Sequence, residues 1–293
     1  MTISAKVIAH SRSRESLPDI YTLELEYPRF IHQEFMTHRV FSRNASSSRA
    51  MSIDKNLNQI VANPAMPIHW GLNEKGMQSR SEASGHDKID AEAYWNRACR
   101  WAIDAAMHLK GIGLHKQIVN RVVEPFSHIR VIVTATEWDN FFALRLHPDA
   151  QPEIQELARV MKAAMDESKP CYLYPGEWHM PYVDDDEFGQ YDEETCRKIS
   201  VARCARVSYK PSTNYSIDKD IELFTRLKDS KHFSPFEHVA TPMQASRWDY
   251  DHHNNVNYPS DPESWETGIT HADREGVLWS GNFREWIQYR QIL

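Results

Sequence analysis

The sequence lacks the features that mark several specialised classes of protein. No apolar run approaches the ~20 residues that a membrane-spanning helix requires, and the first residues contain no apolar stretch typical of a signal peptide. The four cysteines include no CxxC pair, which argues against a disulfide framework or a zinc ribbon. We therefore expect a cytoplasmic protein with free thiols, no bound metal and no contact with a membrane.

An excess of basic residues is also missing. Acidic residues number 41 and basic residues 34, which gives a net charge of -7 at pH 7. A negatively charged chain is repelled by nucleic-acid backbones and by anionic membranes, so we expect no stable complex with nucleic acid. An anionic ligand must instead be bound by a local group of cations.

A length of 293 residues fits one large domain or two small ones. Residues 21–27 alternate between apolar and polar, which is typical of a strand with one exposed face. Periodicity predicts a further strand at 129–134 and helices at 30–41, 91–109, 114–123, 154–165, 221–227 and 282–293. Irregular segments are expected at 42–49, 54–87, 169–186 and 249–275. Because strands and helices mix in both halves, the pattern predicts an α/β (α+β) fold.

The segment 37–49, THRVFSRNASSSR, carries three arginines, a histidine, an asparagine and five hydroxyl groups where the expected helix at 30–41 gives way to a loop. Hydroxyls and unpaired backbone amides at such a position can bind a phosphate, with Arg49 as a bidentate clamp. By composition alone, a solvated basic loop is an equally good interpretation.

The spacing within this segment resembles the signature RHRxxSxNxxSxRY of flavin-dependent thymidylate synthases. Six positions are in register: His38, Arg39, Ser42, Asn44, Ser47 and Arg49. Three positions depart from it, namely Thr37 in place of the first Arg, Ala45 in place of Glu and Ala50 in place of Tyr. The resemblance implies that His38 and Asn44 bind the flavin, and that Ser47 and Arg49, together with Arg39, bind the nucleotide.

Two downstream blocks resemble the same family. Arg121, in RVVEP, resembles the family arginine that reaches the substrate phosphate just before a strand. Asn140 and Arg145, in NFFALRLHPDAQPEI, resemble the segment NFxxLRxxxxAQxEI. By this resemblance Asn140 contributes to the flavin site, and Arg145 contacts the pyrimidine as the catalytic cation. Taken alone, Arg145 would be read as a surface cation.

The remaining family blocks are present but displaced. The elements ARVSY (205–209) and HFSPFEH (232–238) resemble flavin- and folate-binding motifs that precede the arginine motif in the family, whereas here they follow it. The resemblance assigns Ser208, His232 and His238 to cofactor binding. A circular permutation or a partial duplication explains the order, and a weak internal echo between AKVIAHS and CARVSYK fits either origin.

Two other sites are possible at the level of sequence. His232, Glu237 and His238 could hold a metal, but metal-binding helices use an HExxH-type spacing and Pro235 breaks such a helix. Pro170 and Cys171 resemble the nucleophilic Pro-Cys of classical thymidylate synthases. A two-residue match is weak, so we interpret Cys171 as a packing or loop cysteine.

Together these resemblances predict a mixed sheet with flanking helices, as in flavin-dependent thymidylate synthases. They imply transfer of a one-carbon unit from methylenetetrahydrofolate to C5 of dUMP, or of a related pyrimidine deoxynucleotide, with FAD reduced by NADPH. Hydroxymethylation giving 5-hydroxymethyl-dUMP remains an alternative, as does a nucleotide or single-strand nucleic-acid binder without catalysis.

The motif order also suggests how the chain is organised. We expect a nucleotide-binding half at 1–168 and a half with the flavin-binding motifs at 169–293, joined in one catalytic unit. The chemistry requires a pyrimidine ring in contact with the flavin, so the two halves must meet. We expect a homo-oligomer whose site is shared between subunits, as the family resemblance implies.

Overall fold

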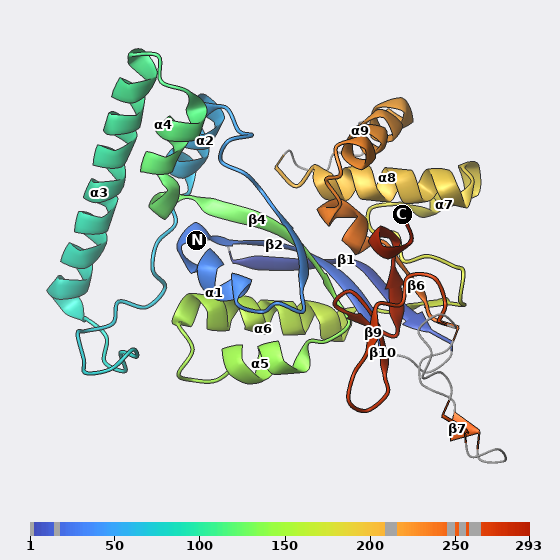
Figure 1. Ribbon diagram of the computed structural model, residues 1–293. Helices are drawn as coiled ribbons and strands as arrows, with labels where there is room; N and C mark the ends of the chain where they lie inside the picture. The colour runs from blue at the N-terminus through green and yellow to red at the C-terminus, as the bar shows by residue number, and fades with distance from the viewer. Residues whose placement is uncertain (1–2, 15–17, 209–215, 245–249, 252–255, 258–264) are drawn as a thin grey trace.

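The computed structural model describes residues 3–14, 18–208, 216–244, 250–251, 256–257 and 265–293, and a five-stranded sheet lies at its centre (Figure 1). The strands are β1 (Ser4–Ser13), β2 (Ile20–Pro28), β3 (Ser42–Ala45), β4 (His128–Ala135) and β5 (Cys171–Leu173). Their order is β3-β4-β2-β1-β5, in which β1 and β5 are parallel and the other neighbours are antiparallel. The predicted α/β fold with a mixed sheet and flanking helices is therefore confirmed.

One face of this sheet is apolar and forms the main core against α6 (Pro152–Glu167). Alternate residues of β2 and β4 and one stripe of α6 supply its fully buried side chains: Leu23, Leu25, Val131, Val133, Ile154, Leu157 and Met161. The period of two in the strands and the helical period in α6 bring these residues to a common surface. The shorter elements η1 (Arg29–Ile31), α1 (His32–Met36) and α5 (Asp139–Arg145) lie on the same side of the sheet (Figure 1).

The opposite face of the sheet is polar and is covered by the C-terminal part of the chain. Here lie α7 (Asp185–Gln190), α8 (Glu193–Ala205), α9 (Ile217–Asp229) and the short helix η3 (Ser234–His238) (Figure 1). The helix η3 packs against β3, β4 and α8. Thr22, Glu24 and Glu26 of β2 point to this side because they alternate with the core residues.

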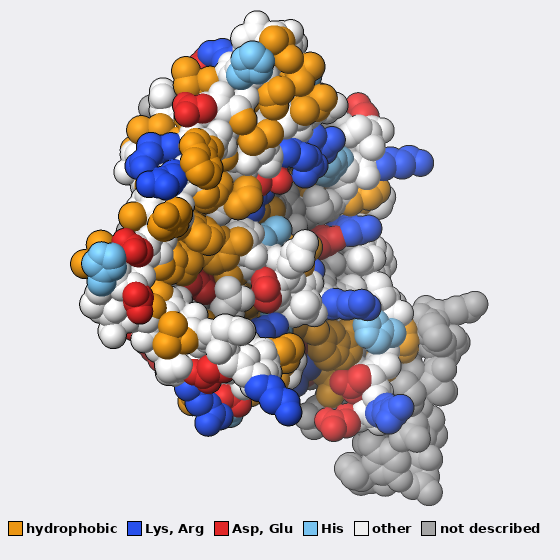
Figure 2. Space-filling model, turned by 90° about the vertical axis from the view of Figure 1, so that its left-hand side faces the viewer, with side chains coloured by type: hydrophobic (Ala, Val, Ile, Leu, Met, Phe, Trp, Pro, Cys, Tyr) orange, Lys and Arg blue, Asp and Glu red, His pale blue; other side chains and the backbone are white. Residues whose placement is uncertain are grey.

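Three helices project from one end of the sheet, namely α2 (Ile53–Ala62), α3 (Gly85–Gly111) and α4 (Lys116–Val122), with η2 (Glu124–Phe126) leading into β4 (Figure 1). They share a small core around Leu57, Ile60 and Val119. Neither α3, with its 27 residues, nor any other helix in the described part of the chain is long and apolar enough to cross a bilayer. Figure 2 looks onto this end and shows apolar side chains gathered on it.

The last part of the chain forms short strands rather than the expected helix at 282–293. The elements are β6 (Ala240–Pro242), β7 (Tyr250–Asp251), β8 (Val256–Asn257), β9 (His271–Ala272), β10 (Leu278–Ser280), β11 (Phe283–Arg284), β12 (Trp286–Gln288) and η5 (Tyr289–Ile292). The apolar residues fit either period, but Glu285 has a φ of 63°, which no helix interior adopts. Pairing of β12 with β6 fixes the extended form.

Other expectations are also corrected. The helix expected at 30–41 ends at Met36, since the chain must turn to pair Ser42 with Thr134, and the loop expected at 42–49 begins with β3 for the same reason. The irregular segments at 54–87 and 169–186 contain α2 and β5. The start of α2 has a recognisable cap, because Ser52 Oγ accepts a hydrogen bond from the Lys55 amide. Tyr209 and parts of 249–275 lie outside the described residues.

Candidate functional site

Arg145 and His38 form a direct pair although 107 residues separate them. Arg145 stands at the end of α5, and its Nε donates a hydrogen bond to His38 Nε2 at 2.9 Å. Its Nη2 donates to Thr37 Oγ1 at 3.2 Å and to the Glu34 carbonyl at 3.4 Å. Two of the predicted site residues are thus brought together at the turn that follows α1.

His38 is neutral in this pair. It is buried against Phe41 and Phe141, and burial together with the charges of Arg145 and Arg43 lowers its pKa to about 4. A neutral imidazole accepts the Arg145 hydrogen bond without cancelling the positive charge. The guanidinium is therefore oriented by an uncharged partner. Arg39, next to His38 in the chain, and Asn140 at the start of α5 are both exposed.

Arg49 and Arg121 line one cavity of about 600 Å³, here named the Arg49 cavity, together with Gln117, Ile118 and Val122. Both arginines are exposed, and Arg121 makes a surface ion pair with Glu124 at 3.5 Å. Such an exposed pair is weak and can be exchanged for another anion. The structure thus brings together the two arginines that the sequence assigned to phosphate.

The segment that carries Arg49 is anchored on α4. Asn120, which is fully buried, donates from Nδ2 to the carbonyls of Ser48 at 2.7 Å and Met51 at 3.3 Å. Ser48 Oγ donates to Glu124 at 2.7 Å. These bonds hold the backbone of the arginine motif in a defined conformation, which is what an anion-binding loop requires.

The arginine motif touches the displaced ARVSY element within a single chain. The backbone amide of Ser47 donates to Ser208 Oγ at 2.9 Å. Asn44 Nδ2 approaches the Cys204 carbonyl at 3.5 Å. Residues about 160 positions apart are therefore adjacent, and the motif order in the sequence is no obstacle to their assembly.

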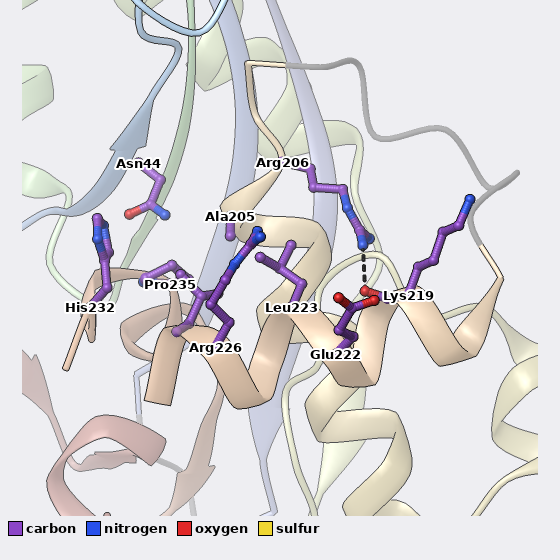
Figure 3. Close-up of a pocket in the computed structure, with 10 residues that line it drawn as sticks. Asn44, Ala205, Arg206, Lys219, Glu222, Leu223, Arg226, His232 and Pro235 are labelled. Carbon is purple, nitrogen blue, oxygen red and sulfur yellow. Dashed lines mark hydrogen bonds between the residues drawn. The ribbon is translucent and has the colours of Figure 1, made fainter. Parts of the chain in front are cut away.

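A cavity of about 470 Å³, here named the Asn44 cavity, opens where β3, α8, α9 and η3 converge (Figure 3). It is lined by Asn44, Ala205, Arg206, Lys219, Glu222, Leu223, Arg226, Leu227, His232 and Pro235. Within the described residues, the buried Oδ1 of Asn44 has no hydrogen-bond partner. An unpaired buried acceptor is costly, so a ligand N–H that reached this atom would relieve that cost.

One face of α9 at this cavity was missed from sequence. Lys219, Glu222 and Arg226 recur at helical spacing and line the cavity (Figure 3). Neither Lys219 nor Arg226 forms an ion pair in the part of the chain that is described. The only available signal was the i, i+3, i+7 spacing of these charges on an otherwise ordinary amphipathic helix.

Buried ion pairs fix the position of the ARVSY element. Asp220 of α9 is fully buried and pairs with Arg206 and, at 3.3 Å, with Arg203 of α8. Arg203 also pairs with Glu187 of α7. Removing one partner of such a pair would leave an uncompensated buried charge, so α7, α8 and α9 are held as one unit beside the cavity.

Ser208 lines another cavity of about 700 Å³, here named the Ser208 cavity, which lies beside the sheet. Its polar lining includes Ser46, Lys55, His128 and Arg130. The Ser208 cavity and the Asn44 cavity flank the contact between the arginine motif and ARVSY.

His238 and Cys171 line none of the three cavities. His238, the last residue of η3, is fully buried, and its Nδ1 lies 2.8 Å from Thr134 Oγ1. Cys171 is exposed on the edge strand β5 and lines none of the three cavities. In the described ranges no three His, Cys, Asp or Glu side chains are grouped so that they could hold a metal.

Comparison with known proteins identifies one family. The model of the Thy1 family, described as thymidylate synthase complementing protein, matches residues 19–171. No curated protein sequence matches the chain.

Two solved structures are similar to the chain, both of a UMP/dUMP methylase, PolB, from Streptomyces cacaoi. The one bound with 5-Br UMP is 19% identical, covers 57% of this chain and 89% of its own, and has a TM-score of 0.49. The one bound with 5-Br dUMP is 17% identical, covers 57% and 90%, and has a TM-score of 0.48.

Proposed function

Because the chain belongs to the thymidylate synthase complementing protein family, we propose that it transfers a one-carbon unit from methylenetetrahydrofolate to C5 of dUMP and produces dTMP. The observation that carries this proposal is the contact between Ser47 and Ser208. It joins the arginine motif to the element that resembles the family's flavin-binding motif, and this contact within one chain supports a shared site for nucleotide and flavin. FAD and NADPH are the proposed redox cofactors.

Arg49 and Arg121 are the proposed phosphate ligands. Their guanidinium groups line one cavity, and a guanidinium binds a phosphate through two parallel hydrogen bonds. The Ser47 hydroxyl accepts a hydrogen bond from the backbone amide of Arg49 at 3.3 Å, and this bond shapes the turn between the two residues. This arrangement supplies the local cationic group that an acidic protein needs to bind a nucleotide.

Arg145 is the proposed catalytic cation. C5 of the pyrimidine attacks a one-carbon donor from an enolate-like form of the ring, in which negative charge is shared between C5 and a ring carbonyl oxygen, and a preorganised cation stabilises that form. The neutral His38 accepts the hydrogen bond of Arg145 and adds no negative charge that would offset the guanidinium. His38 therefore acts here by orienting the guanidinium rather than by transferring a proton.

The residues around the Asn44 cavity suit a flavin or a folate ring. Asn44 offers an unpaired acceptor, His232 offers an exposed imidazole, and Ser208 offers a hydroxyl in the adjoining Ser208 cavity. Heterocyclic rings with N–H groups need such acceptors, and pockets of this volume commonly hold small ligands. When bound, the flavin supplies the hydride that reduces the transferred carbon to a methyl group.

The experiment for the cofactor site uses flavin occupancy. His232→Ala and Ser208→Ala should each lower the fraction of purified protein that carries FAD, with an unchanged circular dichroism spectrum. The control is Lys162→Ala on α6, which lies on the other side of the sheet. Colourless wild-type protein that takes up no flavin on reconstitution would contradict the proposed site.

Hydroxymethylation is the closest alternative, and one contact bears on it. Thr37 stands where the family signature has an arginine, and its hydroxyl accepts a bond from Arg145. A neutral hydroxyl in place of a cation changes the polarity beside the reacting groups, which could admit water to the methylene carbon. The mass of the nucleotide product separates a methyl from a hydroxymethyl group. A hydroxymethyl product would replace the thymidylate synthase assignment while leaving the site intact.

We propose further that the active protein is a homo-oligomer. The pair Arg145–His38, the Arg49 cavity and the Asn44 cavity have no lining residue in common, and in a homo-oligomer residues of one copy can complete the site of another. The helix α3 exposes large apolar side chains suited to an interface: Ile89, Tyr94, Trp101 and Met107 (Figure 2).

Two measurements test this assembly. Trp101→Glu should lower the mass measured by analytical ultracentrifugation, whereas Lys162→Glu should not. If sites are shared, mixing Arg145→Ala with His232→Ala subunits should restore part of the activity that neither variant has. A monomeric wild-type protein, or exchanged subunits that never regain activity, would place all the residues of a site in one chain.

A further inference from the structure

A continuous chain of buried hydrogen bonds crosses the polar face of the sheet and ends at the HFSPFEH element. Ser11 Oγ lies 2.8 Å from His179 Nδ1, and His179 Nε2 lies 2.8 Å from Thr22 Oγ1. Thr22 Oγ1 lies 2.6 Å from Thr134 Oγ1, which lies 2.8 Å from His238 Nδ1. All five side chains are buried. They come from β1, β2, β4, the segment before α7 and η3.

The number of protons in this chain restricts its possible states. Burial lowers the pKa of both His179 and His238 to about 3, so each imidazole is neutral and carries one N–H. Each of the three hydroxyl groups has one proton to donate. Since both nitrogens of His179 are used, one donates and the other accepts. All four hydrogen bonds can form with every donor pointing the same way along the chain, in either of two directions. Arrangements in which Thr22 or Thr134 accepts two bonds also form all four, but they leave the proton of that hydroxyl and the bare Nε2 of His238 unpaired.

The two directions are not equivalent. If Ser11 donates to His179 and every later group donates onward, one group stays unpaired in the described structure, the Nε2–H of His238. In the reverse direction two groups lack partners, the hydroxyl proton of Ser11 and the bare Nε2 of His238. Each unpaired buried polar group costs free energy, so the direction from Ser11 to His238 is the more stable one.

We propose that these five residues form a polarised relay that holds His179 and His238 in the same Nε2–H tautomer, and that His238 is a positioning residue for the Asn44 cavity. The relay attaches η3 to the centre of the sheet. Pro235 of η3 and His232, which precedes it, line the cavity, so the hydrogen bond to Thr134 fixes the wall on which they stand. The part that concerns the cavity rests on the proposed function.

The geometry of the sheet gives His238 a defined neighbourhood. Thr134 of β4 is paired with Ser42 of β3, and Asn44 lies two residues further along β3. Residues directly opposite and two apart on a strand point to the same face, so His238 and Asn44 share the polar face of the sheet. An unpaired donor and an unpaired acceptor, His238 Nε2–H and Asn44 Oδ1, are thus presented on neighbouring parts of one surface.

The tautomers can be measured directly by NMR of the wild-type protein with ¹⁵N-labelled histidine. Long-range ¹H–¹⁵N correlations distinguish the Nε2–H from the Nδ1–H form. The relay predicts that His179 and His238 are both Nε2–H at neutral pH. Opposite tautomers at the two sites, or a doubly protonated ring at either, would overturn it, and this comparison needs no substitution.

Thr134→Val gives a second, long-range readout. It removes the hydroxyl that joins Thr22 to His238, and the remaining segment of Ser11, His179 and Thr22 then has one unpaired group in either direction. His179 should therefore lose its single tautomer although it does not contact Thr134. Thr134→Ser should restore it. Thr136→Val is the matched control, because Thr136 is a buried threonine just after β4 that stands outside the relay, and its hydroxyl accepts a hydrogen bond from the Arg284 amide. An unchanged His179 in Thr134→Val would contradict the relay.

Flavin binding separates the relay from the proposed function. Thr134→Val should weaken FAD binding by about five- to tenfold, the usual effect of one lost hydrogen bond, with recovery in Thr134→Ser. If the tautomers agree with the relay and no variant binds flavin, the proposed function fails and the relay stands. If flavin binds equally in all variants while the tautomers change as expected, His238 has no positioning role at the cavity.

Discussion

The two faces of the central sheet are built from alternate residues of the same strands, yet they differ in chemistry. One face presents Leu23 and Val133 to α6 and is dry. The other presents Thr22 and Thr134, which bond to each other at 2.6 Å, to elements from the C-terminal part of the chain. The comparison suggests that the apolar face supplies stability and that the polar face supplies the attachment for the displaced motifs. Substitutions on the two faces should therefore have different consequences.

The largest effect is expected on the apolar face. Leu157 of α6 is fully buried, and Leu157→Ala removes its contacts and leaves a cavity, which should cost about 2–5 kcal/mol of the free energy of unfolding. Urea denaturation measures this cost. Val61→Ala on the exposed surface of α2 is the control and should change stability little. A loss of flavin binding in Leu157→Ala under conditions where the protein is fully folded would argue against the division between the faces.

Arg145→Ala should have the next largest effect, and it should act on turnover. Removing one preorganised group that stabilises developing charge usually lowers kcat by about 10²–10³. The dUMP affinity should change less, because the enolate-like ring that attacks the donor carries the negative charge and the bound ground state does not. Steady-state kinetics measures both quantities.

Cys171→Ala is the companion to Arg145→Ala and should keep full activity, since Cys171 lines none of the cavities. If Cys171→Ala is inactive and 5-fluoro-dUMP forms an adduct with the Cys171 thiol of the wild-type protein, the reaction uses a covalent mechanism.

A smaller effect is expected at the Arg49 cavity. Loss of one charge-assisted bidentate contact costs roughly 1.5–3 kcal/mol, so Arg49→Ala and Arg121→Ala should each weaken dUMP binding by about tenfold to a hundredfold. Calorimetry is the measurement, and Arg159→Ala on α6 is the matched control. Unchanged dUMP affinity in both variants would show that the phosphate does not bind in the Arg49 cavity.

The smallest effect, counted per pH unit, is a pH dependence of the unfolding free energy that arises from His238 on the polar face. The folded pKa of His238 lies near 3, below its ordinary value of 6.5. Its contribution to stability is complete above pH 6.5 and is lost as the pH falls toward 3, because the unfolded chain binds the proton first. The slope is at most about 1.4 kcal/mol per pH unit for one group. His238→Gln should flatten the curve of unfolding free energy between pH 6 and 4, measured by urea titration; an equally steep curve would contradict this prediction.

The contrast between the faces also explains what could be predicted from sequence. Hydrophobic periodicity located β2, β4, α3 and α6 because the apolar residues of each segment recur at the period of its strand or helix. It failed for β3 and for the C-terminal strands. Ser42–Ala45 has little strand propensity and is extended only because β4 pairs with it.

The site residues divide in the same way. The motif spacing brought Arg49, Asn44 and His232 to attention, and the structure adds where each of them lies. Three other features depend on contacts between distant segments. They are the bond between Arg145 and His38, the charged side chains of α9 that line the Asn44 cavity, and the relay that ends at His238. A single sequence contains no local signal for such contacts, so they could be recognised only in three dimensions.

The central claim is that the arginine motif and the displaced motifs form one site for a flavin and a pyrimidine nucleotide. The most direct test is to incubate the purified protein, reconstituted with FAD, with dUMP, methylenetetrahydrofolate and NADPH, and to determine the mass of the nucleotide product. We predict bound flavin and conversion of dUMP to dTMP, with conversion abolished in a variant that combines Arg49→Ala and Ser208→Ala. Protein that binds no flavin and leaves dUMP unchanged would contradict the account.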